Sequence, residues 1–489
     1  MLFHHCYFGT GKASIFSILL YGILFNTSSM LTPFAEAQQF QIEIDAGNQL
    51  DPSRVSKYMT TNDPVVNVND PILSRAFLDA GLKHVRVYAD FDFLIPVSKL
   101  KKTFRLDFRR YDAHIDGITN KLRAVPLIML RSIPRVVSSR ADLPDDTYAT
   151  YPPINWADWE TVVRLLVRHN VQKGLRGLYY AVWNEPELNG DWQGTYNEYI
   201  TLYIRTARAV KGEDPSAKVG GPSANSWTIP WMGRSSRSHT GPFIKDFLSS
   251  IKEYNINNPG SAVPVDFISW HHYSPDYLSV GYKEVNRYVS QVGFPRAPEY
   301  LVTEWNSEYG NTAHPWNLKA SFAVTNIIQQ IATPQVWPFW FTFRIPKSQD
   351  LPTDYNSGLI ANDDVNCKRP TYAAFQMMNA MTTGNFVSTS PSPELAVIAT
   401  RDDQASKVAT VVANYNPTNK SAKVSFTGLP FTTSSIKQKI QWIDNTRSMG
   451  CGGLEAGTVD HLSVKNKSIS FGLNFPAYSI AQITLTSKR

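Results

Sequence analysis

Three sequence features are missing from this chain, and the absence of each one argues against a class of protein. Although the net charge is +7, there is no Lys/Arg-rich run of the kind found in nucleic-acid-binding proteins; Lys99, Lys101 and Lys102 lie in mixed sequence. After residue 25, no stretch approaches the roughly 20 apolar residues of a transmembrane helix. No glycine-rich phosphate loop follows the first β-rich run, which disfavours a doubly wound, nucleotide-binding sheet. The mildly basic surface would suit an anionic polysaccharide, but an ordinary solvated surface is the simpler interpretation.

The first 37 residues are interpreted as a signal peptide. Lys12 precedes the apolar run Ala13–Phe25, and Ala35-Glu36-Ala37 is an A-x-A cleavage pattern. A mature chain starting at Gln38 would be secreted and not inserted in a membrane; an uncleaved anchor is the alternative. Two cysteines would remain, and the sequence does not decide whether they pair. They are Cys367 and Cys451, and a eukaryotic source would also make Asn419 and Asn466 candidate glycosylation sites.

Residues 38–384 are predicted to form a (β/α)₈ barrel. Short β-rich runs alternate with helix-like stretches, and Trp156–Gln172 places its apolar residues on one helical face. Parallel barrel strands are buried on both faces and read as apolar runs. The eight runs are Phe40–Asp45, His84–Tyr88, Ala124–Leu130, Gly177–Trp183, Lys218–Pro222, Asp266–Tyr273, Tyr300–Trp305 and Val336–Phe341.

Residues 385–489 are predicted to form an antiparallel β-sandwich. Alternating strands are separated by turn residues, as at Asn416-Pro417, and no helical pattern intervenes. The segment near Gln39 is too short for a domain of its own, and the sandwich is able to recruit it as an extra strand.

Two glutamates at strand ends are the predicted catalytic pair. Glu185 follows the fourth β-rich run within Trp183-Asn184-Glu185-Pro186, and Glu304 ends the seventh within Thr303-Glu304-Trp305. Barrel enzymes place their chemistry at the carboxyl ends of strands, and two carboxylates there suit glycosidic bond cleavage. As acid/base, Glu185 should have a raised pKa, whereas Glu304 must stay ionised to attack the anomeric carbon. Asn184 would hydrogen-bond the sugar 2-hydroxyl.

These motifs resemble the retaining (β/α)₈ glycosidases, and within them glycoside hydrolase family 39, the family of β-xylosidases and α-L-iduronidases. Further pieces that carry the resemblance are Val219-Gly220-Gly221-Pro222-Ser223, Phe267–Tyr273 and Pro476-Ala477-Tyr478-Ser479-Ile480. The resemblance spans about residues 40–489. It implies a barrel plus β-sandwich, retention of anomeric configuration, no metal and no cofactor. It also implies Glu185 as acid/base and Glu304 as nucleophile.

Strand alternation places His271 and Tyr273 on one face of the sixth run, toward the barrel mouth, and His272 on the other. Tyr273 would hold the nucleophile, and His271 the substrate or the acid/base. Arg86 resembles the arginine that supports the nucleophile in this group of enzymes. Trp340 is a candidate stacking platform, with packing of the barrel wall as the alternative.

The remaining acidic and basic residues near the strand ends are not assigned to the catalytic pair. Glu187 and Glu308 lie beyond the strand ends and are expected to be surface or ion-paired residues. The family's β-xylosidases usually carry an acidic stretch after the eighth strand, where this chain has Arg344 and Lys347. Their charge raises the hypothesis of an acidic glycan substrate; the alternative is that both side chains face solvent and have no role in substrate binding.

The overall interpretation is an exo-acting glycosidase of the β-xylosidase/iduronidase type, with an oligosaccharide or polysaccharide as its partner. An endo-acting polysaccharide hydrolase and a catalytically silent carbohydrate-binding barrel are the alternatives. The sequence does not identify the sugar, the anomer or the oligomeric state.

Overall fold

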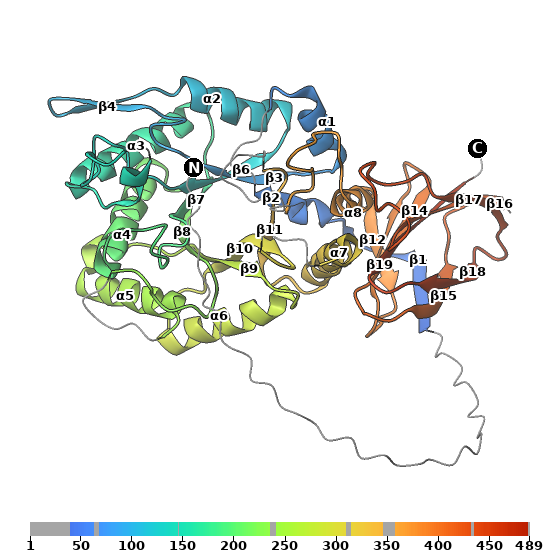
Figure 1. Cartoon of the computed structure of the whole chain (residues 1–489). Coiled ribbons are helices and arrows are strands. Elements are labelled where there is room, and N and C mark those ends of the chain that lie inside the picture. The colour runs from blue at the N-terminus through green and yellow to red at the C-terminus, as the bar shows by residue number, and fades with distance from the viewer. Residues whose placement is uncertain are drawn as a thin grey trace, which may run out of the picture.

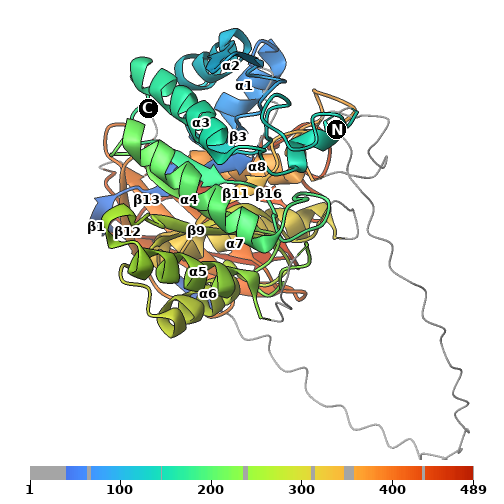
Figure 2. The same cartoon turned by 90° about the vertical axis from the view of Figure 1, so that its left-hand side faces the viewer.

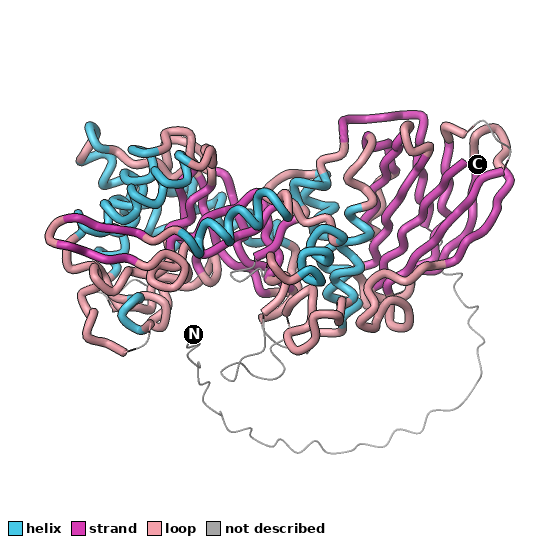
Figure 3. The backbone as a smooth tube through the Cα atoms, turned by 90° about the horizontal axis from the view of Figure 1, so that it is seen from above, coloured by secondary structure: helices cyan, strands magenta, loops and turns pink. Residues whose placement is uncertain are grey.

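The structure, a computed structural model, describes residues 40–62, 68–144, 146–234, 241–309, 314–345, 357–431 and 435–487. Two parts are distinct in Figures 1 and 3: a barrel surrounded by helices, and a part built almost wholly of strands. No helix among these residues is both long and apolar enough to cross a membrane. The segment interpreted as a signal peptide, residues 1–37, lies outside the described residues.

The barrel closes through eight parallel strands in the order β10-β11-β2-β3-β6-β7-β8-β9, which confirms the predicted fold class. A small apolar cluster that includes Leu127, Phe267, Leu301 and Phe339 fills the barrel interior. Such packing makes the inside of the barrel a core and leaves its carboxyl end for chemistry. The strands are β2 (Thr60–Asn62), β3 (His84–Tyr88), β6 (Val125–Leu130), β7 (Tyr179–Val182), β8 (Lys218–Ala224), β9 (Phe267–Tyr273), β10 (Glu299–Asn306) and β11 (Trp337–Phe341).

Helices surround the barrel, and Figure 2 shows α3 to α6 side by side along its outer face. Helix α3 has the predicted bounds because Asn155 caps its first turn and its apolar stripe is buried. The helices are α1 (Pro71–Asp79), α2 (Arg109–Asp116), α3 (Trp156–Gln172), α4 (Tyr196–Glu213), α5 (Phe243–Asn257), α6 (Leu278–Val292), α7 (Trp316–Ala332) and α8 (Pro370–Asn379). Short helical turns occupy Val55–Tyr58, Gly117–Lys121, Thr147–Thr150 and Pro259–Ser261.

One predicted barrel strand was wrong. The run Phe40–Asp45 belongs to β1 (Phe40–Pro52), which pairs with β12 and β15 of the second part, and the first barrel strand is β2. Ile42 and Ile44 are fully buried, while their neighbours Gln41 and Glu43 are exposed. This alternation is typical of a sheet with one solvated face, not of a barrel strand.

The second part is a nine-stranded sheet in the order β17-β16-β19-β14-β13-β12-β1-β15-β18. Neighbouring strands are antiparallel except β1 and β15, which are parallel. One apolar cluster joins inward side chains of β1 and β15 with those of β14, β16 and β19, so the two halves of the sheet share a core as in a sandwich. Besides β1, the strands are β12 (Asn385–Thr389), β13 (Ala396–Asp402), β14 (Lys407–Asn414), β15 (Lys420–Thr427), β16 (Ser435–Ile443), β17 (Thr458–Ser463), β18 (Ile469–Phe475) and β19 (Ser479–Ser487).

The two parts are packed and cross-linked. Helix α7 contacts β13, β14 and β19, and α8 contacts β16 (Figure 1). Cys367, before α8, forms a disulfide with Cys451, in the loop between β16 and β17. The Tyr415 hydroxyl, after β14, donates to the Pro275 carbonyl at 2.8 Å, so the sheet also supports the loop that follows β9. A separate hairpin, β4 (Val97–Leu100) and β5 (Thr103–Leu106), projects from the far side of the barrel.

Candidate active site

Glu185 lies three residues after β7, where the backbone leaves the barrel strand in a sharp turn. Trp183 and Glu185 both have positive φ, 72° and 45°, which reverses the backbone sharply at the strand end. The backbone N–H of Glu185 donates to the Ser223 carbonyl at 3.0 Å, and the Trp183 indole donates to the Asp191 carbonyl at 2.9 Å. These contacts fix the Glu185 backbone against β8.

Glu304 lies on β10, almost completely buried, with both oxygens engaged. Arg86 Nη1 is 2.6 Å from Oε1, and the Tyr273 hydroxyl donates to Oε2 at 2.6 Å. A guanidinium and a hydroxyl donor thus hold the two oxygens of the carboxylate in one orientation. Arg86 also donates through Nη2 to Asn184 Oδ1 at 2.8 Å, so the amide of Asn184 is oriented by the same side chain.

Among the described residues, Glu185 is held through only one of its two oxygens. His271 Nδ1 is 2.6 Å from Oε1, and Asn225 Nδ2 donates to the same oxygen at 2.8 Å. Burial raises the pKa of Glu185, but the charge of His271, hydrogen bonds from His271 and Asn225, and the charge of Arg131 together bring it below its ordinary value. The expectation of a raised pKa was therefore wrong for the site without substrate, because it left out the hydrogen bonds and positive charge that His271, Asn225 and Arg131 supply.

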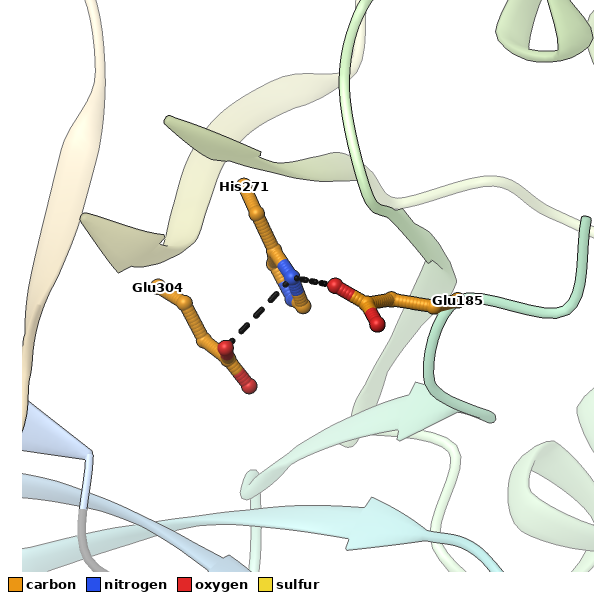
Figure 4. Close-up of side chains that lie close together, drawn as sticks. All are labelled: Glu185, His271 and Glu304. Carbon is orange, nitrogen blue, oxygen red and sulfur yellow. Dashed lines mark hydrogen bonds and ion pairs between the residues drawn. The ribbon is translucent and has the colours of Figure 1, made fainter. Parts of the chain in front are cut away.

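The two carboxylates face each other across His271 (Figure 4). One oxygen of Glu185, one oxygen of Glu304 and one ring nitrogen of His271 all lie within 4.8 Å of one another. The same three groups have the spacing of metal ligands. Arg86, however, already places a positive charge 2.6 Å from Glu304, and this charge would repel a second cation.

Strand alternation is confirmed on β9. His271 and Tyr273 reach the two glutamates, whereas His272 points away, stacked on Trp227 with ring centroids 4.9 Å apart. The structure thus brings together six of the predicted residues: Glu185, Glu304, Asn184, Arg86, His271 and Tyr273.

Trp340 does not join them, which corrects its prediction as a stacking platform. Its side chain is 1 % exposed and packs between Trp305, 4.9 Å away, and Phe375 of α8, 6.3 Å away. It therefore lies on the outer, helix-facing side of β11. The next residue, Phe341, has the opposite orientation and lies edge-on to Tyr273 at 5.8 Å.

Of the two glutamates expected to be surface or ion-paired, only one behaves so. Glu308 pairs with Lys319 at 2.7 Å. Glu187 is fully buried, and its Oε1 accepts the backbone N–H of Asn225 at 2.7 Å. Burial, reinforced by the charge of Glu185, raises the pKa of Glu187 well above its ordinary value. The expectation failed because the chain turns back over the barrel after β7 instead of leaving it.

Sequence reasoning missed three further residues near the glutamates. Arg131, directly after β6, pairs with Asp191 at 3.0 Å, and Asn225 directly follows β8. Burial and the charges of Glu185 and Glu304 raise the pKa of Asp191 to about 7, although Arg131 lowers it. Arg131 and Asn225 each directly follow a barrel strand, so the rule that barrel enzymes place functional residues at strand ends could have predicted them, as it did Glu185. Asp191 lies within a loop, where no sequence pattern marks it.

The basic residues after β11 do not form a free charged wall. The guanidinium of Arg344 donates to the carbonyl oxygens of Ala361 at 3.1 Å and Asn362 at 3.0 Å. Lys347 lies outside the described residues.

Comparison with known proteins places this geometry in a family. Residues 70–427, which contain every residue of the site, match the family described as Glycosyl hydrolases family 39. The chain belongs to this family. Two curated β-xylosidases are similar: that of Caldicellulosiruptor saccharolyticus is 25% identical over 67% of this chain and 64% of its own length, and that of Geobacillus stearothermophilus is 27% identical over 47% of each chain. The matches therefore span less than two thirds of these relatives.

The family's fold covers nearly the whole chain. The crystal structure of a monomeric β-xylosidase from Caulobacter crescentus CB15 superposes with a TM-score of 0.72 at 18% identity, covering 92% of this chain and 100% of that one. The barrel and the nine-stranded sheet are thus both part of a fold already known in family 39.

Proposed function

We propose that this family 39 protein is a retaining exo-glycosidase that hydrolyses β-xylosides or closely related β-glycosides. The observation that carries the proposal is the approach of the Glu185 and Glu304 carboxylates, with oxygens within 4.8 Å. Carboxyl groups about 5–5.5 Å apart are typical of double displacement, whereas about 6.5–9.5 Å leaves room for the water of an inverting enzyme. The two β-xylosidase relatives support the choice of sugar.

In the first step, Glu304 attacks the anomeric carbon. Arg86 and Tyr273 each occupy one of its oxygens and hold the carboxylate in one orientation. A bond forms between a Glu304 oxygen and the anomeric carbon while the bond to the leaving-group oxygen breaks. Asn184, whose Oδ1 is fixed by Arg86, turns its Nδ2 toward the sugar 2-hydroxyl.

The leaving-group oxygen takes a proton from Glu185. Oε1 of this carboxyl group is held by the 2.6 Å hydrogen bond with His271 Nδ1, which leaves Oε2 for the leaving group. We infer that substrate binding excludes water from the Glu185 carboxyl group and favours its protonated form, because burial disfavours the charged form. In the second step Glu185, now ionised, removes a proton from water, which attacks the anomeric carbon and releases Glu304.

Secretion is part of the proposal. The A-x-A pattern ending at Ala37 supports export, and the Cys367–Cys451 disulfide is the kind of bond that persists in an oxidising compartment. We therefore propose that the enzyme acts outside the cytosol, on an oligosaccharide or polysaccharide.

The test is a panel of aryl glycosides with the purified mature protein, followed by NMR of the first sugar anomer released. β-Xylose released from a β-xyloside supports retention and the sugar assignment. Initial release of α-xylose refutes double displacement. Cleavage restricted to internal bonds of long xylans points instead to an endo-acting hydrolase, and binding without turnover points to a silent binding protein.

A further inference from the structure

Glu187 is an unusual residue for a loop at the barrel mouth. It is fully buried, it has no ion-pair partner among the described residues, and its Oε2 has no hydrogen-bond partner there. Burying a carboxyl group in this way is costly unless the group has a use. Its two polar contacts are both with the segment that follows β8.

These contacts tie the β7 and β8 loops together. Glu187 Oε1 accepts the backbone N–H of Asn225 at 2.7 Å, and the Glu187 carbonyl accepts the N–H of Met232 at 3.0 Å. Asn225 in turn donates its side-chain amide to Glu185 Oε1 at 2.8 Å. Asn225 therefore connects the buried Glu187, through its backbone N–H, with the carboxyl group of Glu185, through its side-chain amide.

We propose that Glu187 is a positioning residue which, through Asn225, fixes the orientation of the Glu185 carboxyl group. Asn225 and His271 both bind Oε1, while the described residues give Oε2 no partner. With Oε1 held from two sides, the carboxyl plane cannot rotate freely, and Oε2 is the oxygen presented to the glycosidic bond. This inference rests on the proposed function of Glu185.

Glu187 acts in this relay as an acceptor and not as a charge. Burial raises its pKa well above the ordinary value, and its side-chain contact with the Asn225 N–H uses it as an acceptor. Glutamine, which keeps an Oε1 acceptor, should therefore replace it in the relay, whereas leucine has a similar size and no acceptor. The two substitutions separate the hydrogen bond from the packing of the side chain.

The alkaline limb of kcat/KM reports loss of the proton from the acid/base in the free enzyme. The hydrogen bond from Asn225 lowers the pKa of Glu185. Losing it should raise that pKa and move the limb to higher pH, by about one unit. The other titratable groups that face Glu185 are unchanged in these variants; they are His271, Arg131, Asp191, Glu304 and Tyr88.

The experiment compares Glu187→Leu, Glu187→Gln and Asn225→Ala with the parent on 2,4-dinitrophenyl and phenyl β-xylosides across pH. We expect Glu187→Leu and Asn225→Ala to move the alkaline limb upward. Both should also lower kcat/KM about tenfold more for the phenyl substrate, whose poor leaving group needs the proton. Glu187→Gln should return both properties toward the parent.

Asp214→Ala is the matched control. Asp214 is also buried and also accepts a backbone N–H, from Gly177 at 2.8 Å, but it precedes β8 at the opposite end of the barrel. Its loss should lower the melting temperature without moving the pH limb or changing the leaving-group dependence.

Two outcomes overturn the inference. In the first, Glu187→Leu keeps the parent's alkaline limb and leaving-group dependence of kcat/KM. In the second, Glu187→Gln moves the alkaline limb as far as Asn225→Ala does. If Glu187→Leu does not fold, the comparison of Glu187→Gln with Asn225→Ala decides by the second criterion. Full activity of Glu185→Ala on the phenyl substrate would instead refute the proposed function, and the inference with it.

Discussion

The disulfide between Cys367 and Cys451 gives a stability prediction whose size follows from the chain. The two residues are separated by 84 positions and join the segment before α8 to the loop between β16 and β17. In the loop-entropy description, closing a loop of this length stabilises the folded chain by about 4.5 kcal/mol at 25 °C. With about 1 kcal/mol/K of unfolding entropy for a chain of this size, the melting temperature should fall by about 5 °C without the bond.

The perturbation is Cys367→Ser combined with Cys451→Ser. Neighbouring hydrogen bonds remain, among them Lys368 N–H to the Cys451 carbonyl, so the native contact should persist and the loss should come from the unfolded state. Calorimetry gives the melting temperature, with the reduced parent as control. The reduced parent should match the double variant, and reductant should not affect the variant. Thiol titration shows whether the disulfide is present in the parent. If it is present and its removal lowers the melting temperature by less than about 1 °C, the loop-entropy reasoning is refuted.

Three further predictions concern the site. Glu304→Gln keeps an acceptor for Arg86 but removes the nucleophile, so kcat should fall by on the order of a thousandfold or more while the melting temperature holds; parent-like turnover of an activated aryl glycoside contradicts the assignment. Glu185→Ala should affect poor leaving groups most, and azide should restore turnover with a retained glycosyl azide as product; equal losses without rescue indicate a structural role. The guanidinium of Arg344 is occupied by two backbone carbonyls, so Arg344→Ala should change kcat/KM equally for neutral and uronic-acid substrates, at low and at high salt. A loss confined to the uronic-acid substrate would support the acidic-glycan hypothesis.

Sequence patterns were most informative where a strand's carboxyl end carried a polar residue. The fold class and the grouping of Glu185, Glu304 and Tyr273 follow from short buried runs and the two-residue period of a strand, and the role of Arg86 follows from the family resemblance. For His271 the sequence left two partners open, the substrate and the acid/base, because the choice depends on how neighbouring strands are staggered. The contact with Glu185, and the resulting direction of the Glu185 pKa, were therefore decided only in three dimensions.

The errors have equally specific causes. The strand β2 is only Thr60–Asn62, three buried polar residues, and was missed because the search for barrel strands relied on apolar runs. In β11 nearly every side chain is large and aromatic, so the sequence does not distinguish Trp340, which faces the helices, from Phe341, which faces Tyr273. The loop positions of Glu187 and Asp191 depend on a chain reversal that has no periodic signal.

The placement of β1 affects how the protein can be made and divided. This strand precedes the barrel in the chain, yet it sits between β12 and β15, whose residues are synthesised after the barrel. During translation the barrel residues are therefore synthesised before β12 and β15, the pairing partners of β1. Until these strands follow, Ile42 and Ile44 have no sheet to cover them. A shortened gene that stops after α8 would leave this apolar edge permanently unpaired and prone to aggregate. Separate expression of the sheet requires β1 to be grafted onto residues 385–487, for example as a circular permutant.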